Sequence, residues 1–235
     1  MIKKIVHLAD IHIRTFRMHD EYKDVFKTLI KDIKDNIDGY ESDEVRILIA
    51  GDLVHQKIVI SNEQLMLGTW FLRELEKLAP VILIAGNHDF CFEKVNQPHH
   101  KGDYDWLNNL MTEENLSQSD VTYLEDNFMT IESPEFSRPI KFYGSPWQPN
   151  FYDWAFNLPR MGDEIKSKWE MIPDDTDVLI THGPPQEIRD FVSNWRQGDM
   201  NVGCELLRYE LDNRIKPSLH VFGHIHGAYG GVYNK

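Results

Sequence analysis

Apolar residues follow two different periods along the first part of the chain. Short continuous apolar runs are typical of buried strands, whereas apolar residues recurring every three to four positions predict amphipathic helices. Ser61 and Gln64 form a capping box, which marks the start of the second helix. The order strand, helix, strand, helix, strand predicts right-handed crossovers and a largely parallel sheet. The predicted elements are strands at 3–9, 45–50 and 81–85 and helices at 22–37 and 61–78.

The second part of the chain carries a weaker signal at first and then resumes the same alternation. Short strands at 128–131 and 141–143 are separated by proline-containing turns, which favours an antiparallel pair. No internal repeat, low-complexity tract or linker interrupts the chain, so we expect one domain over residues 1–235. The other predicted elements are helices at 105–116 and 202–215 and strands at 177–181 and 219–222.

Composition and charge narrow the classes of protein that this chain can represent. Hydrophobic residues make up 41% and charged residues 27% of the 235 residues, values that exclude wholesale disorder. The net charge is 25 − 38 = −13, which argues against a broad basic surface for long nucleic acids. Two cysteines are too few for a disulfide framework. The sequence lacks an apolar run of membrane-spanning length and a signal-peptide core, so we expect a cytoplasmic protein without membrane contact.

Polar clusters follow five of the predicted strands directly. In open α/β sheets, ligands bind beyond the carboxyl ends of the strands, so side chains from distant parts of the sequence can converge at that edge. We therefore expect these clusters to build one site. They are Asp10-Ile11-His12, Gly51-Asp52, Gly86-Asn87-His88-Asp89, Thr181-His182 and Gly223-His224-Ile225-His226.

The residue types in these clusters predict a pair of divalent metal ions. Imidazole together with carboxylate and amide oxygen favours manganese, iron or zinc over calcium, and we expect manganese first. Seven ligands are too many for one ion of four to six coordination, but they suit two ions that share a carboxylate. Two such ions, two aspartates and one hydroxide leave a charge of about +1, which attracts a phosphodiester anion. The candidate ligands are Asp10, His12, Asp52, Asn87, His182, His224 and His226.

These motifs, in this order, resemble those of the calcineurin-like metallophosphoesterases. The resemblance implies an α/β fold with a four-layer αββα sandwich and a dinuclear centre. It also implies that His88 protonates the leaving alkoxide or steadies the transition state, and that Asp89 orients His88. The resemblance assigns Asp10, His12, Asp52 and His226 to one ion and Asp52, Asn87, His182 and His224 to the other, with Asp52 bridging.

The two parts of the chain resemble different branches of this superfamily. From about Tyr123 to Gly230, the sequence is similar to the metallophosphoesterase-domain-containing (MPPED) proteins, which implies an enzyme like the class III cyclic-nucleotide phosphodiesterases. Three N-terminal segments are more similar to SbcD-type DNA-repair nucleases, namely His7-Leu8-Ala9-Asp10-Ile11-His12, His19-Asp20-Glu21-Tyr22 and Gly51-Asp52-Leu53-Val54-His55.

These resemblances lead to one favoured function and two alternatives. We expect a metal-dependent phosphoesterase that cleaves phosphodiesters of nucleotides or small nucleic acids, DNA or RNA, by attack of a metal-bridged hydroxide. The first alternative is an SbcD-like DNA exo- or endonuclease subunit that works with an ATPase partner. The second is a non-catalytic metal-binding scaffold. A homo-oligomer is compatible with each of these functions.

Several residues near the motifs have roles that the sequence leaves open. His55 could contact the phosphate, donate a hydrogen bond to one of the metal-binding residues, or cap the turn after Asp52. Arg14 could contact the phosphate or lie in an exposed loop. An aromatic stretch between Phe142 and Phe156 is expected to belong mostly to the core. Trp147 and Phe151 are its best candidates to line the cleft.

Overall fold

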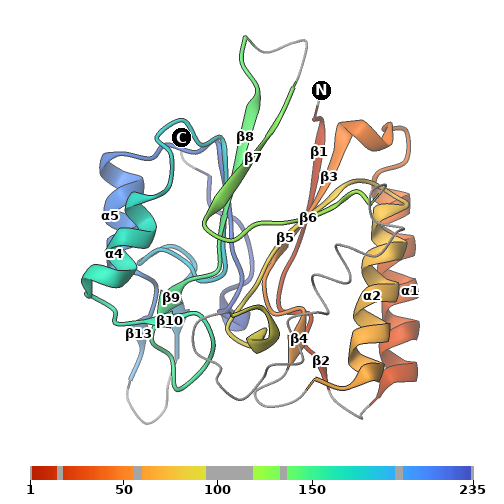
Figure 1. Ribbon diagram of the computed structural model, residues 1–235, viewed down its shortest axis with the longest axis horizontal. Helices are drawn as coiled ribbons and strands as arrows, with labels where there is room; N and C mark the ends of the chain where they lie inside the picture. Colours follow the sequence, from red (N-terminus) through yellow and green to blue (C-terminus); the bar gives the residue numbers. More distant parts are fainter. Residues whose placement is uncertain are drawn as a thin grey trace.

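Two four-stranded sheets face each other at the centre of the computed structural model, and helices cover their outer faces (Figure 1). Helices α1 and α2 lie outside one sheet, whereas α4 and α5 lie outside the other. This arrangement confirms the predicted αββα sandwich. The structure describes residues 2–14, 18–55, 60–93, 119–132, 137–193 and 198–233, and the predicted helix at 105–116 lies outside these residues.

The first sheet contains the strands predicted from the N-terminal part of the chain. Its strand order is β1-β3-β5-β6, and all neighbours are parallel. The side chain of Ser61 accepts a hydrogen bond from the backbone N–H of Gln64, which confirms the predicted capping box at the start of α2. The elements are β1 (Lys4–Leu8), α1 (His19–Asn36), β3 (Val45–Ala50), α2 (Asn62–Glu76), β5 (Val81–Ile84) and β6 (Val121–Tyr123).

The second sheet has the strand order β14-β11-β8-β7, and only the pair of β7 and β8 is antiparallel, as predicted. Helix α5 is shorter than predicted because residues 202–204 are not helical and the thiol of Cys204 caps the helix. Helix α4 was not predicted, since only Ile165 and Trp169 of this short helix are buried. The elements are β7 (Asn127–Ile131), β8 (Ile140–Ser145), α4 (Asp163–Glu170), β11 (Val178–Thr181), α5 (Glu205–Asn213) and β14 (Leu219–Val221).

Shorter elements lie in the loops that connect the two sheets and their helices. Parallel pairing of β2 with β4 joins the loop after Asp10 to the loop after Asp52. Single 3-10 turns cover Ser42–Glu44, Phe90–Phe92 and His226–Ala228. The short strands are β2 (Ile13–Arg14), β4 (Val54–His55), β9 (Gln148–Pro149), β10 (Asn157–Leu158), β12 (Phe191–Val192) and β13 (Met200–Asn201).

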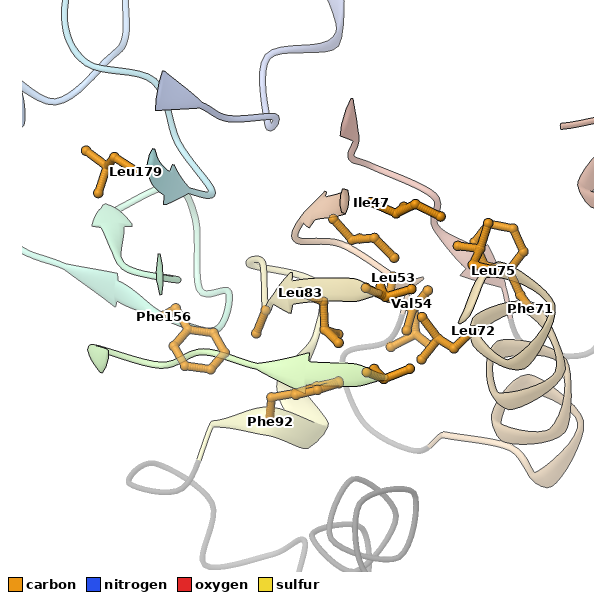
Figure 2. Close-up of a cluster of buried hydrophobic side chains, with 14 of the residues drawn as sticks. Ile47, Leu53, Val54, Phe71, Leu72, Leu75, Leu83, Phe92, Phe156 and Leu179 are labelled. Carbon is orange, nitrogen blue, oxygen red and sulfur yellow. The ribbon is translucent and has the colours of Figure 1, made fainter. Parts of the chain in front are cut away.

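Strand β3 shows how the two faces of a sheet are packed. Its alternate residues point to opposite faces, so Leu48 packs between the two sheets while Ile47 packs under the helices. The layer between the sheets also contains Ile82 of β5 and Ile180 of β11. Figure 2 shows the outer layer, in which Ile47 and Leu53 lie beside residues of α2. Every residue of β3 is buried, which explains why five of its six residues are apolar. The sixth, Arg46, donates hydrogen bonds to the backbone carbonyl groups of Asp43 and Val45.

Among the described residues, no helix has both the length and the apolar character that crossing a membrane requires.

Truncation of Leu48 tests the packing between the sheets. Leu48 is completely buried in this layer, so Leu48→Ala should lower the free energy of unfolding by about 2–5 kcal/mol. Val25 on α1 is 61% exposed, and Val25→Ala should change it by less than about 0.5 kcal/mol. Urea unfolding of both variants measures the difference. Equal losses would show that the two sheets do not depend on contact through Leu48.

Candidate metal centre

All five predicted polar clusters meet at the carboxyl ends of strands from both sheets. Clusters after β1, β3 and β5 come from the first sheet, and clusters after β11 and β14 come from the second. Their side chains form two groups of potential metal ligands. The structure therefore brings together all seven candidates: Asp10, His12, Asp52, Asn87, His182, His224 and His226.

The first group combines two imidazoles with two carboxylates. His12 Nε2 lies 3.2 Å from His226 Nε2. Asp10 Oδ1 lies 3.4 Å from His226 Nε2, and Asp52 Oδ2 lies 3.6 Å from His12 Nε2. The four atoms that face one another all carry, or can carry, a free lone pair.

The second group is built around the side-chain amide of Asn87. Asn87 Oδ1 lies 2.9 Å from both His182 Nε2 and His224 Nδ1. Asp52 Oδ2 lies 3.5 Å from His182 Nε2. The same Asp52 oxygen therefore belongs to both groups. The amide oxygen thus faces the two histidines, while Asn87 Nδ2 is buried and has no hydrogen-bond partner among the described residues.

The spacing of these atoms fits coordination of a divalent ion. Metal–nitrogen and metal–oxygen bonds of about 2.1 Å place neighbouring ligand atoms about 3.0–3.4 Å apart in octahedral or tetrahedral geometry. The separations across both groups run from 2.9 Å for Asn87 and His182 to 3.6 Å for Asp52 and His12. Imidazole, carboxylate and amide groups are also among the donors that divalent metal ions take in proteins. The residues present thus fit a metal site.

Unusual backbone conformations place four of the seven side chains. Asp10, His12, Asp52 and His224 have φ angles between 53° and 70°, in the left-handed region. For a residue other than glycine, this conformation costs about 1–3 kcal/mol of folding free energy and persists only where surrounding contacts stabilise it. Here the loops hold each other, because His12 N–H donates to Asp52 O at 2.9 Å and Asp10 N–H donates to Gly51 O at 3.1 Å.

The carboxylates at the site also brace neighbouring loops. Asp10 accepts a hydrogen bond from the backbone N–H of His224 at 3.0 Å, and Asp52 Oδ1 accepts one from the backbone N–H of His88 at 2.8 Å. Glycine permits the first of these approaches. A Cβ atom at Gly223 would lie only 2.5 Å from Asp10 Oδ2, so any other residue there would displace the carboxylate.

His182 is completely buried and has a defined orientation. Its Nδ1 lies 2.9 Å from Ala50 O and donates to it, which directs Nε2 toward Asp52 and Asn87. Burial lowers the pKa of His182, but attraction by Asp52 and then Asp10 outweighs burial and raises this pKa to about 9. In the chain alone, a proton on His182 therefore balances the buried carboxylate. A bound cation would replace that proton.

Other site groups have pKa values that suit metal binding. Burial lowers the pKa of His12 and of His224 to about 3, so both rings are neutral and keep a lone pair at neutral pH. Burial alone would raise the pKa of Asp52, but attraction by His182 and His12 outweighs it and holds this pKa below its usual range. His12, His224 and Asp52 are therefore in the protonation states that a cation requires, whereas His182 has to lose its proton to bind one.

Asp89 does not make the predicted contact with the ring of His88. Its buried carboxylate accepts hydrogen bonds from the backbone N–H groups of Leu53, Val54 and Gly86 at 3.2, 2.8 and 2.8 Å. His88 Nδ1 is buried and has no hydrogen-bond partner within the described ranges. The expectation that Asp89 orients His88 through its side chain is thus corrected. Asp89 instead satisfies the amides of two loops that would otherwise be buried without partners.

His55, whose role the sequence leaves open, and Trp154, which the sequence does not single out, both lie against His88. His55 Nδ1 is 3.2 Å from His12 Nδ1, and its ring stacks on that of His88 with centroids 4.2 Å apart. The centroid of the Trp154 ring lies 3.9 Å from the centroid of the His88 ring. Trp154 belongs to the aromatic stretch that the sequence assigned mostly to the core, and no local pattern separates it from its neighbours. Arg14 is exposed on β2.

A cavity of about 920 Å³ adjoins the second sheet beside His224 and His226. Phe151 lines this cavity and is 48% exposed, which confirms its predicted place in the cleft. Trp147 was predicted there too, but it is buried in the core. Its Nε1–H donates to Asp126 at 2.8 Å, and its ring packs against that of Phe156.

Fold and site together define a metal-binding α/β sandwich of the phosphoesterase type. The family model described as Calcineurin-like phosphoesterase matches residues 3–228, and the chain belongs to this family. Such enzymes are metal-dependent hydrolases of phosphoesters.

Relatives support the resemblance to the MPPED proteins. Metallophosphoesterase domain-containing protein 1 from Homo sapiens is 40% identical over 151 residues, which cover 63% of this chain and 45% of that protein. UPF0046 protein T07D4.2 from Caenorhabditis elegans is 42% identical over 48% of this chain and 26% of that protein. A solved structure of a protein of unknown function from Aquifex aeolicus has 18% identity and a TM-score of 0.37 over 92% of this chain and 89% of that chain. The chain thus spans less than half the length of the curated relatives named here.

Metal addition tests the site directly. Mn²⁺ at about one hundred times its Kd should raise Tm by about 5–10 °C, because ligand binding to the folded state contributes about 2.7 kcal/mol. Asp52→Asn should lose more than half of this shift, since Asp52 belongs to both ligand groups. Asp24 is an exposed aspartate on α1, and Asp24→Asn should retain the full shift. Thermal unfolding with and without Mn²⁺ measures all three. The same Tm shift in the unmodified protein and both variants would show that Mn²⁺ binds at a site that does not include Asp52.

Proposed function

We propose that this protein is a phosphodiesterase that uses two divalent metal ions to cleave nucleotides or small nucleic acids. The observation that carries this proposal is the position of Asp52. One of its oxygens lies 3.6 Å from His12 Nε2 and 3.5 Å from His182 Nε2, so a single carboxylate joins two groups of ligands. An ion pair sharing a carboxylate is typical of enzymes that hydrolyse phosphoesters.

Each ion would be held by residues from different loops. When bound, such ions supply a nucleophile from water at neutral pH and offset the charge on the phosphoryl oxygens. Manganese is the expected ion, and iron or zinc would also suit these donors. One group would be Asp10, His12, Asp52 and His226, and the other would be Asp52, Asn87, His182 and His224.

His88 would assist departure of the leaving oxygen. Its Nδ1 is buried and has no partner in the part of the chain that the structure describes, so Nε2 is the nitrogen left to reach a substrate. Burial lowers the pKa of His88 to about 4 in the chain alone, which leaves a neutral ring that donates a hydrogen bond. A phosphate oxyanion beside the ring would raise this pKa, and the ring could then hold the proton that the leaving alkoxide takes.

The cavity beside the site supports a small organic phosphodiester as the substrate. Exposed aromatic rings of Phe151, Tyr152 and Phe191 line it, and such rings can stack on a nucleobase. The net charge of −13 favours short substrates over long nucleic acids, whose binding requires many cationic contacts. The similarity to the MPPED proteins points in the same direction.

Hydrolysis of two diesters with Mn²⁺ tests this function. We expect the protein to cleave bis-p-nitrophenyl phosphate and the dinucleotide TpT but to leave long end-labelled DNA largely intact. Asp52→Asn should lower kcat by about a hundredfold or more, because loss of the shared carboxylate removes several kcal/mol of transition-state stabilisation. The Tm of the metal-free variant controls for a general loss of stability.

Other outcomes of this assay favour the alternatives. Rapid degradation of long DNA would favour an SbcD-like nuclease that works with an ATPase partner, and it would contradict the preference for small substrates. Binding of Mn²⁺ without hydrolysis of any of these substrates would contradict the enzymatic function and favour a metal-binding scaffold. Activity that survives Asp52→Asn would contradict the shared-carboxylate site.

A further inference from the structure

The imidazole of His88 packs against the rings of His12, His55 and Trp154. His55 is stacked on it at a centroid distance of 4.2 Å with an interplanar angle of 21°, and the centroids of His55 and Trp154 are 6.1 Å apart, so these two rings contact His88 from adjacent sides. The indole of Trp154 has its centroid only 3.9 Å from that of His88, with an angle of 48°. Among the described residues no carboxylate orients the ring, since Nδ1 has no hydrogen-bond partner there and Asp89 binds backbone amides. Packing therefore has to do what a hydrogen bond to Nδ1 does for many catalytic histidines.

Trp154 is itself held close to the loop that carries His88. The N–H of Ala155, its neighbour in the chain, donates to Asn87 O at 3.1 Å. The next residue, Phe156, is completely buried, and its N–H donates to Glu93 Oε1 at 3.1 Å. These two contacts tie the segment around Trp154 to the loop after β5, at Asn87, and to Glu93 directly after the following 3-10 turn. The backbone beside Trp154 is thus held close to the loop that carries His88.

Trp154 also differs from the aromatic residues that surround it in sequence. Phe151 and Tyr152 line the cavity, whereas Trp154 is not among the residues that line it. Its ring contacts include those with His88, His55 and Phe90. Trp154 therefore contacts the predicted proton donor directly, whereas Phe151 and Tyr152 line the cavity.

We propose that Trp154 is a positioning residue for His88, and that its indole directs Nε2 of that ring toward the leaving oxygen of the substrate. This inference rests on the proposed function. An aromatic pair contributes only about 0.5–1.5 kcal/mol beyond its area burial, but a displacement of about 1 Å at a reacting group can slow a reaction by about a hundredfold. Trp154 therefore affects turnover far more than it affects stability.

The leaving group distinguishes positioning of a proton donor from other effects. The leaving alkoxide of TpT is strongly basic and needs a proton, whereas p-nitrophenolate leaves readily without one. His88→Ala should therefore slow cleavage of TpT by about a hundredfold or more and affect bis-p-nitrophenyl phosphate much less. Trp154→Leu should show the same pattern, with kcat for TpT about 10 to 100 times lower and KM nearly unchanged.

Further variants test whether Trp154 acts on the reaction through His88. In the double variant of His88→Ala with Trp154→Leu, cleavage of TpT should be no slower than in His88→Ala, because residues that act through one another are not additive. Trp154→Phe should recover part of the lost rate, since phenylalanine keeps an aromatic face. Trp70→Leu is the matched control, because Trp70 is a half-buried tryptophan of α2 that packs on the outer core. It should reduce Tm without any dependence on the leaving group.

A measurement on the metal-free protein is independent of activity. The Hε1 proton of His88, identified by its absence from the NMR spectrum of His88→Ala, should be shifted by the ring current of Trp154. Trp154→Leu should move this resonance, and Trp70→Leu should leave it in place. Mn²⁺ affinity, read from the shift in Tm, should be the same in Trp154→Leu as in the unmodified protein.

The possible outcomes separate this inference from the proposed function. A normal rate for Trp154→Leu on TpT, while His88→Ala is slow, would overturn only the positioning role. Equal slowing of both diesters by Trp154→Leu, a multiplied loss in the double variant, or an unmoved His88 resonance would also overturn it. Full activity of His88→Ala on both diesters would remove His88 from the reaction and overturn the role of both residues.

Discussion

The buried carboxylate of Asp52 is the charge around which the rest of the site is arranged. It is 1% exposed, and an unbalanced charge at such a position costs several kcal/mol. One oxygen accepts a backbone hydrogen bond from His88, and the other faces His12 and His182 from different sheets. The two sheets must therefore pack in one register for this charge to be balanced, and a bound cation would strengthen the same arrangement.

The loops at this edge stabilise one another in a way that makes the site rigid before any ligand binds. Asp89 satisfies amides of the loop after β3, and Asp10 binds the backbone of the loop after β14. Left-handed residues such as Asp10 and Asp52 persist because these hydrogen bonds hold them. Electrostatic and proton-transfer catalysis require the ligands and His88 to be placed rigidly, since a displacement of about 1 Å slows either kind of catalysis.

Much of the fold could be predicted because its central strands are short, largely apolar runs with polar residues directly after them. The features that the sequence did not predict also have physical reasons. Helix α4 has only eight residues and two buried positions, so its period is too short to detect. Trp147 and Trp154 occur in one aromatic stretch, but one packs in the core and the other lies on His88. Nothing local in the sequence distinguishes them.

By itself, the sequence determined which side chains follow the strands, and therefore which ligands a parallel sheet gathers at its carboxyl edge. That inference works because strand direction alone places the ends together. Only the tertiary structure decided which oxygen of Asp52 is shared, that Asp89 serves backbone amides, and that Trp154 covers His88. Each of these contacts joins segments far apart in the chain, so it depends on how the two sheets pack and not on any local pattern.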